Sequence, residues 1–195
     1  MRWIGQQEQP NGFYLIEVEQ DDDTERPVNF AVSDGERQAL LFKQQGNKLL
    51  FMTEQAFPEA ATLQPKNTQA WVFLKELTAS LSPSQPVLIT GSNPAMATVF
   101  HLANVLKPAF DVRAVLASES AFPFVVKPAR FLFPDFPSHA IGAATLLEDW
   151  QIPNRLCSEA ALPGCYDGCL GDLWSQWTPP KDWQLIDCDR LRPGD

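Results

Sequence analysis

The stretch of sequence that decides the fold is VLITGSNPAMATVF, residues 87–100. Residues 87–89 form an apolar run that is typical of a buried strand; the run ends at Thr90-Gly91, and a polar turn follows. Residues 94–106 then carry apolar side chains at helical spacing, and Asn93 is suited to cap the helix that they predict. A strand, a tight turn and a helix in this order begin many nucleotide-binding α/β sheets.

The turn contains one glycine, Gly91, where nucleotide-binding turns use two or three. Glycines there let a pyrophosphate approach the backbone N–H groups at the start of the helix. The sequence leaves two interpretations open. Either Gly91, Ser92 and Asn93 still hold a nucleotide or a small anion against the helix N-terminus, or the turn serves to pack the strand against the helix.

From residue 86 onward, strands alternate with helices along the chain. Further strands are predicted at residues 111–116, 155–157 and 183–188, and further helices at residues 139–150, with Ile141, Ala144 and Leu147 inward, and at residues 166–177. Such an alternation predicts a parallel sheet covered by helices on both faces.

Residues 1 to about 65 are β-rich and lack this alternation. Strands are predicted at residues 13–19, 28–32, 38–42 and 48–52, with turns at Asp34-Gly35 and at Gly46. A helix is predicted at residues 68–80, and a proline-rich linker follows it. We therefore expect an α/β protein in two parts. An antiparallel β-rich subdomain ending in a helix occupies residues 1–84, and a parallel sheet flanked by helices occupies residues 85–195.

Charge and composition exclude several classes of function. The chain of 195 residues has 24 acidic and 15 basic side chains, a net charge of −9, and no cluster of Lys or Arg. A nucleic-acid or anionic-membrane surface is therefore not expected. No apolar run approaches the ~20 residues that span a bilayer, and the first residues lack the apolar core of a signal peptide. A cytoplasmic protein is expected.

The cysteines and the acidic run near the N-terminus favour no metal site. The four cysteines are Cys157, Cys165, Cys169 and Cys188. They form no C-x-x-C pair and both histidines lie far upstream, so reduced thiols are expected. Residues 21–25 are interpreted as a solvated turn, because no Gly or distal Glu follows at calcium-loop spacing. Cys165 or Cys169, near a helix N-terminus, is either a reactive thiol or a small buried side chain.

Four motifs occur in order in the second half of the chain. They are the strand-turn-helix PVLITGSNPAMATVFHLANVL, the proline-rich VLASESAFPFVVKPARFLFP, the helix, strand and D-G-x-x-G-like loop of LLEDWQIPNRLCSEAALPGCYDGCLGDLWSQW, and the final WQLIDCDRLRPGD. In this order they resemble the NAD-binding domain of the ferredoxin–NADP reductase superfamily. The resemblance covers about residues 85 to 190 and is nearest to the electron-transfer subunit of dihydroorotate dehydrogenase and its oxidoreductase relatives.

The resemblance implies a set of cofactor-binding positions at the carboxyl edge of the strands. The candidates are Gly91, Ser92, Asn93, Ser118, Gly164, Asp167, Gly168 and Cys188. In the resembled family the glycine turn meets the pyrophosphate, and the loop that corresponds to residues 162–172 lines the nicotinamide side of the cleft. The family's final Cys-Gly-Pro turn lies against the nicotinamide, and Cys188 occupies its first position.

The sequence departs from the family pattern at several of these places. Asp189 and Arg190 stand where the family has Gly and Pro, and the side chains of Ser92 and Asn93 narrow the phosphate turn. The cysteines lack the spacing that ligates a [2Fe–2S] cluster. No flavin-binding Arg motif is found, and the first half is short for a flavin-binding barrel. FAD and [2Fe–2S] are therefore not expected, and NAD(P) is the one cofactor that stays open.

The proline-rich segment AFPFVVKP also allows two interpretations. Phe122 and Phe124 with the neighbouring prolines form a docking surface, and Lys127 and Arg130 contact an anionic ligand. Alternatively, the segment is a long connection packed on the sheet edge. His101 is interpreted as a packing or surface residue, not as a catalytic base.

These features lead to a function hypothesis and its alternatives. The chain is expected to be a non-catalytic or reduced relative of flavin and NAD(P)H reductases, a binding or accessory protein with a protein partner or a second copy of itself. The alternative is an NAD(P)H-dependent oxidoreductase component that receives its flavin from a partner subunit. A third hypothesis is a scaffold that dimerises through the proline-rich segment. No catalytic residue is assigned, because no Ser-His-Asp order, P-loop Lys or paired-acid motif stands out.

Overall fold

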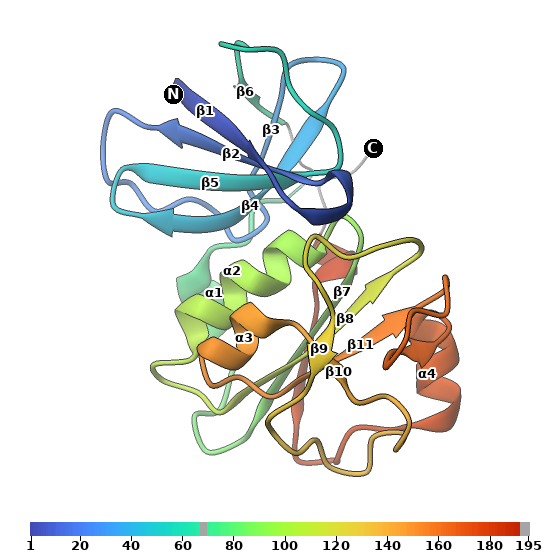
Figure 1. Cartoon of the computed structure of the whole chain (residues 1–195). Helices are drawn as coiled ribbons and strands as arrows, with labels where there is room; N and C mark the ends of the chain where they lie inside the picture. Colours follow the sequence, from blue (N-terminus) through green and yellow to red (C-terminus); the bar gives the residue numbers. More distant parts are fainter. Residues whose placement is uncertain (67–69, 192–195) are drawn as a thin grey trace.

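The structure is a computed structural model that describes residues 1–66 and 70–191. Two sheets lie one above the other, with a helix between them (Figure 1). The upper sheet is antiparallel, and its strands are β1 (Arg2–Glu8), β2 (Tyr14–Glu19), β3 (Ala31–Ser33), β4 (Gln38–Gln45), β5 (Lys48–Thr53) and β6 (Gln64–Pro65). Their order in space is β1-β2-β5-β4-β3-β6. The predicted antiparallel first half is therefore confirmed, although the strand order is not that of a simple meander.

Side-chain alternation along these strands separates two faces of the antiparallel sheet. Ile16 and Phe51 belong to a buried cluster inside the sheet's curve, together with Phe30 and Phe57. Leu15, the neighbour of Ile16, faces the other way and packs against the core shared with the second half. The turns at Gly35 and Gly46 have φ of 99° and 59°, which favours glycine because other residues rarely adopt positive φ.

Two predictions in the first half were wrong in part. Strand β1 was not predicted, and the predicted strand at residues 28–32 begins only at Ala31. The predicted helix at residues 68–80 is confined to α1 (Leu74–Ala79), and residues 67–69 lie outside the described part. Residues 70–73 are not helical, because their backbone pairs with Asn29: its Nδ2 donates to the Ala70 carbonyl, and its Oδ1 accepts from the Val72 N–H. Tertiary hydrogen bonds outweigh the helical propensity here.

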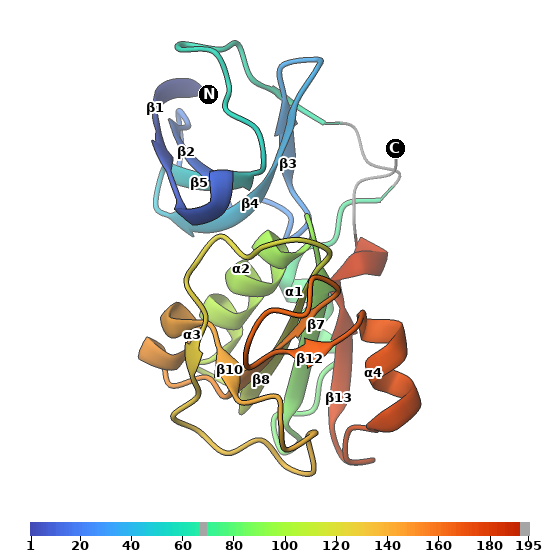
Figure 2. The ribbon, with the colours of Figure 1, turned by 45° about the vertical axis from the view of Figure 1, so that its right-hand side comes forward.

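The lower sheet is parallel throughout. Its strands are β7 (Val87–Ser92), β8 (Val112–Ser118), β11 (Asn154–Ser158), β12 (Tyr166–Asp167) and β13 (Gln184–Asp187), in the order β12-β11-β8-β7-β13. Helices α2 (Met96–Leu106) and α3 (Thr145–Asp149) cover one face, and α4 (Leu170–Gln176) covers the other (Figure 2). The prediction of a parallel sheet with helices on both faces is confirmed.

Helix boundaries in this half differ from the predictions. The predicted helix at 139–150 begins at Thr145, because residues 142–143 form β10 (Gly142–Ala143), which pairs with β9 (Lys127–Pro128). Ile141, expected inward, is 55% exposed. Likewise, the first residues of the predicted helix 166–177 form β12, which adds an edge strand to the sheet. Each of these segments has only two residues, which is too short to show a strand period in the sequence.

Helix α2 joins the two sheets through one continuous core. Its Phe100 ring lies 5.2 Å, centroid to centroid, from the Phe42 ring of β4. The same buried cluster contains Val87 and Ile89 of β7, whereas Leu88 between them faces the α4 side. Burying apolar area from both sheets against one helix holds the halves together, and this sets the position of the cleft between them.

Candidate functional site

The turn after β7 lies at the switch point of the parallel sheet, where strand order reverses and α/β sheets usually bind ligands. Gly91 and Ser92, predicted to begin the turn, are the last two residues of β7, and the turn itself comprises residues 93–95. Strands β8 and β13 flank β7, so Gly91 and Ser92 meet Cys188 and Asp189, which follow β13 in the short 3-10 helix η2 (Cys188–Leu191). A Cβ on Gly91 would lie 2.7 Å from Val99 Cγ2 and 3.2 Å from Cys188 Cβ. Gly91 is therefore required by the close approach of α2 and η2.

The carboxylate of Asp189 lies at the end of β7, at the place where a nucleotide-binding sheet would hold a phosphate. The Ser92 backbone N–H donates to the two carboxylate oxygens at 3.1 and 3.2 Å, and Ser92 Oγ lies 2.9 Å from both. The Asp189 N–H in turn donates to Asp187 Oδ1 at 3.1 Å. Such charge-assisted bonds to a backbone N–H are stronger than neutral ones. The protein's own carboxylate thus takes the donors of this turn.

Asn93 and Ser118 bind each other across the neighbouring strand ends. Asn93 Nδ2 donates to Ser118 Oγ at 3.1 Å, and Ser118 Oγ donates to the Ala121 carbonyl at 2.8 Å. The prediction that Asn93 caps α2 was wrong. The helix begins at Met96, two residues after Pro94, and its first residue follows Ala95 without a side-chain cap. The polar side chains at this place tie the two turns together.

The remaining predicted residues lie along the same edge but farther from Gly91. Strands β8 and β11 separate β7 from β12, a distance of roughly 14 Å at the usual strand spacing. There the Gly168 N–H donates to the Ser158 carbonyl at 3.1 Å, and Asp167 is exposed. The Gly164 carbonyl accepts from the Gly142 N–H at 2.6 Å. The structure therefore brings Gly91, Ser92, Asn93, Ser118 and Cys188 together and places Gly164, Asp167 and Gly168 apart from them.

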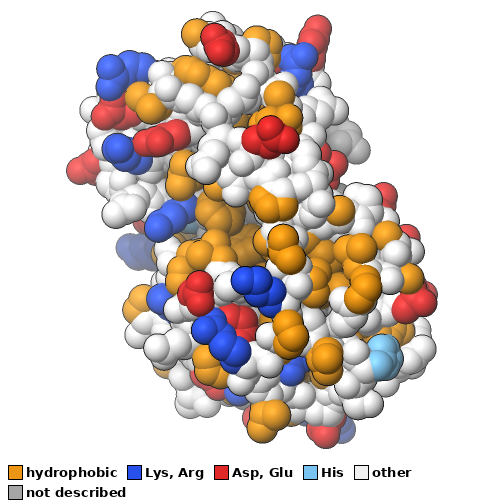
Figure 3. Space-filling model, viewed as in Figure 1, with side chains coloured by type: hydrophobic (Ala, Val, Ile, Leu, Met, Phe, Trp, Pro, Cys, Tyr) orange, Lys and Arg blue, Asp and Glu red, His pale blue; other side chains and the backbone are white. Residues whose placement is uncertain are grey.

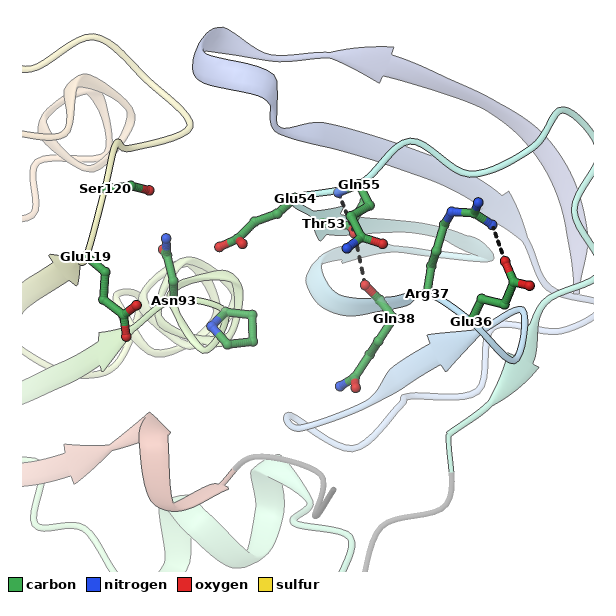
Figure 4. A pocket seen from close by; sticks show the side chains of 10 residues that line it. Glu36, Arg37, Gln38, Thr53, Glu54, Gln55, Asn93, Glu119 and Ser120 are labelled. Carbon is green, nitrogen blue, oxygen red and sulfur yellow. Dashed lines mark hydrogen bonds and ion pairs between the residues drawn. The ribbon is translucent and has the colours of Figure 1, made fainter.

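A cleft of about 370 Å³ opens beside the β7 turn, between the two sheets. Asn93, Pro94, Glu119 and Ser120 line it from the parallel side, and Glu36, Arg37, Gln38, Thr53, Glu54 and Gln55 line it from the antiparallel side. Figure 4 shows Glu54 extending toward Asn93 across this cleft, with Glu119 on the far side. The volume lies within the usual range of small-molecule sites.

The charge of this cleft is predominantly negative. Three carboxylates and one guanidinium line it, and Arg37 Nη1 is already paired with Asp34 Oδ2 at 2.9 Å and with Glu36 Oε2 at 3.5 Å. Burial raises the pKa of Glu54, and the nearby Glu119 carboxylate raises it further. Sequence analysis missed these residues. In the structure Glu54 directly follows β5 and Glu119 directly follows β8, but nothing in the sequence indicates that these two strand ends face each other.

The cysteines are mostly buried thiols. Burial raises the pKa of Cys165 to about 11 and raises the pKa of Cys157 and Cys188 well above the ordinary range. Cys169 is half-buried at the start of α4, where its N–H donates to Asp172 Oδ2 at 3.0 Å. Within residues 1–66 and 70–191, no group of three or more His, Cys, Asp or Glu side chains is placed to hold a metal ion. In the same ranges, no helix is long and apolar enough to cross a membrane.

A dinucleotide pyrophosphate does not fit the turn as the structure has it. The N–H and Oγ of Ser92 already donate to Asp189, and Pro94 has no N–H to offer. The adjoining cleft carries an excess of carboxylates, which repel the negative charges of a pyrophosphate. The residues present therefore do not form a phosphate-binding turn of the usual kind.

Comparison with solved structures identifies similar folds at low sequence identity. An NADH-dependent reduced ferredoxin–NADP oxidoreductase matches with a TM-score of 0.57 at 9% identity, over 95% of this chain and 67% of that one. A cytochrome P450 reductase from Amycolatopsis matches with 0.62 at 11% identity, over 95% of this chain and 60% of that one. The flavohem-like FAD/NAD-binding domain of a nitric oxide dioxygenase from Vibrio cholerae matches with a TM-score of 0.53 at 11% identity, over 95% of this chain and 85% of that one.

This chain is thus shorter than each of these three proteins and spans 60% of the reductase from Amycolatopsis. No family model matches the sequence, and no curated protein matches it either. The likeness is one of fold, and it extends over the antiparallel sheet as well as the parallel one. The chain has the fold of the ferredoxin–NADP reductase-like FAD/NAD-binding domains.

Proposed function

We propose that this chain is a non-catalytic or reduced relative of flavin and NAD(P)H reductases and acts as a binding or accessory protein. Among the flavin and NAD(P)H reductases, we propose the electron-transfer subunit of dihydroorotate dehydrogenase as its nearest relative. We also propose the division into residues 1–84 and 85–195. The observation that carries the function is the Asp189 carboxylate on the Ser92 N–H and Oγ, at the place where a phosphate would bind.

Two further observations support this function. The cleft beside the turn is lined by three carboxylates and one guanidinium, which disfavours an anionic cofactor. Gly91 is in tight contact with Val99 and Cys188, so the crevice between β7 and β13 is filled with side chains. An accessory protein needs the shape of the domain but not an open crevice, because its partner can recognise the outer surface.

Ligand binding to the purified full chain tests this function. With NADH, NADPH, FAD or FMN at millimolar concentration, we expect no rise in the melting temperature and no flavin absorbance in the protein as purified. The variant Asp189→Asn removes the charge and keeps the shape of the side chain, so it should let inorganic phosphate reach the Ser92 N–H. An NMR shift of the Ser92 amide on adding phosphate would report this, and Asp182→Asn, an exposed acid elsewhere, is the matched control.

A clear thermal shift of the unmodified chain with any of the four cofactors, or copurified flavin, would contradict the accessory function. It would favour the alternative, an NAD(P)H-dependent oxidoreductase component that works with a flavin-bearing partner subunit.

A further inference from the structure

Two adjoining hollows lie beside the proline-rich segment, which forms part of the wall of each. The first has a volume of about 210 Å³ and is almost entirely apolar. Leu15 and Met52 of the antiparallel sheet, Phe100 of α2, Phe124 of the segment and Leu146 of α3 line it. An apolar cavity of ~150 Å³ stays dry and accepts benzene. This hollow therefore has room for one aromatic or large aliphatic side chain.

The second hollow has a volume of about 230 Å³. It is lined by the cationic side chains of Lys127 and Arg130, by the carboxylate of Glu148, and by Thr145, the residue that directly precedes Leu146. Arg130 Nη2 pairs with Asp149 at 2.7 Å, and its Nε lies 3.2 Å from Glu148. Lys127 makes no ion pair with any carboxylate in the described ranges. Figure 3 shows a hollowed hydrophobic area between the two halves of the molecule, with Lys and Arg side chains directly below it and Asp or Glu side chains among them.

The wall between the hollows is held in place before any ligand binds. Asn11 Nδ2 donates to the Phe122 carbonyl at 2.7 Å, and the Phe122 ring stacks on Phe124 with centroids 5.2 Å apart. The Ala129 N–H donates to the Ile141 carbonyl at 2.7 Å. A preorganised surface binds with a smaller entropic cost than one that must first become ordered.

Exposed apolar side chains occur among the residues that line the two hollows and close to them along the chain. Val125 is 63% exposed, Ile141 55% and Leu146 38%. Clustered apolar exposure beside a hollow is typical of a protein-interaction surface. Together with Lys127 and the apolar hollow, these residues define what we call the docking surface.

We infer that the docking surface binds an acidic segment of a partner protein. The segment places one aromatic or large aliphatic side chain in the apolar hollow and its carboxylates beside Lys127. The inference rests on the proposed accessory function and names the kind of partner. Lys127, which has no carboxylate partner among the described residues, favours an acidic occupant.

Binding of short fluorescein-labelled peptides to the intact chain tests the inference by anisotropy. The probes carry one tryptophan followed by three glutamates, at several spacings between them, and in a matched set serine replaces tryptophan. We expect at least one tryptophan peptide to bind about tenfold more tightly than its serine counterpart and to shift the NMR signals of residues 123–130. Higher salt should weaken it, because a surface charge pair is screened.

Two variants locate the binding site. Lys127→Glu reverses the charge of an exposed side chain and should weaken peptide binding about tenfold or more, whereas Lys181→Glu changes the net charge equally at a distant exposed lysine and should leave it within about twofold. Leu146→Glu should weaken it as well. If circular dichroism shows that Leu146→Glu is unfolded, the Lys127 and Lys181 pair decides alone.

The inference is overturned if none of the peptides binds, if the serine set binds equally, or if the two lysine variants behave alike. A dimer that Leu146→Glu dissociates would overturn it too, because a second copy would then be the occupant. Cofactor binding in the thermal-shift assay with peptide binding intact would remove the proposed function alone. Absence of peptide binding with no cofactor bound would remove this inference alone.

Discussion

His101 is expected to make the stability of this protein depend strongly on pH. The side chain lies on α2 and is 5% exposed, and its Nδ1 has no hydrogen-bond partner in the described part of the chain. Burial lowers the pKa of His101 from 6.5 to about 4. No charged neighbour contributes to this shift, so the cause is the loss of solvation of the imidazolium.

The sign and size of the effect follow from this pKa. As the pH falls below 6.5, the unfolded chain binds a proton at His101 and the folded chain does not until about pH 4. The free energy of unfolding therefore decreases as the pH falls through this window. The full loss is about 3.4 kcal/mol below pH 4, and about 2 kcal/mol is already lost at pH 5 relative to neutral pH.

Urea denaturation, followed by tryptophan fluorescence at neutral pH and at about pH 5, measures this loss. The variant His101→Leu removes the titrating group and keeps an apolar side chain of similar size, so its stability should change about 2 kcal/mol less between the two pH values. All other titrating groups are common to both proteins and cancel in the comparison. His139→Leu, at an exposed position, is the matched control and should behave as the unmodified chain. If His101→Leu and the unmodified chain lose the same stability, burial of a neutral imidazole is not the cause.

Three further predictions concern other parts of the molecule. Gly91→Ala should lower the free energy of unfolding by about 1–3 kcal/mol in urea denaturation, because the new Cβ would lie 2.7 Å from a neighbouring methyl group; an unchanged midpoint would mean that the turn relaxes freely. Glu54→Gln should raise the melting temperature at pH 7 and leave it unchanged near pH 3, because the raised pKa of Glu54 gives stability at low pH that is lost as the carboxyl ionises beside Glu119. Calorimetry at both pH values checks this, and a lower melting temperature at pH 7 would contradict it. Cys169 should react with a maleimide in the folded protein while Cys165 reacts only after unfolding, since burial raises the pKa of Cys165 to about 11; mass spectrometry of the labelled peptides decides, and labelling of Cys165 first would refute it.

Much of the candidate site was predictable because it lies at a strand end that the sequence marks clearly. The apolar run at residues 87–89, followed by Thr90-Gly91, predicts both the strand and the turn, and parallel strands place Ser92 and Ser118 at one edge. The sequence indicated only that Asp189 replaces the Gly of the family pattern, and it did not predict the contact between Asp189 and Ser92. Its carboxylate reaches Ser92 because β13 pairs with β7 from a distance of about a hundred residues, which local patterns do not contain.

The sequence by itself determined the kind of element at most positions and the alternation that requires a parallel sheet, since hydrophobic period and turn residues act over a few neighbours. Tertiary structure decided which surfaces meet. Hydrogen bonds from Asn29 keep residues 70–73 out of a helix. Glu54 and Glu119 line one cleft from opposite sheets, and the proline-rich segment lines the apolar hollow. These outcomes depend on hydrogen bonds and burial between segments far apart in the chain. The free energy of such contacts exists only once the whole fold has formed.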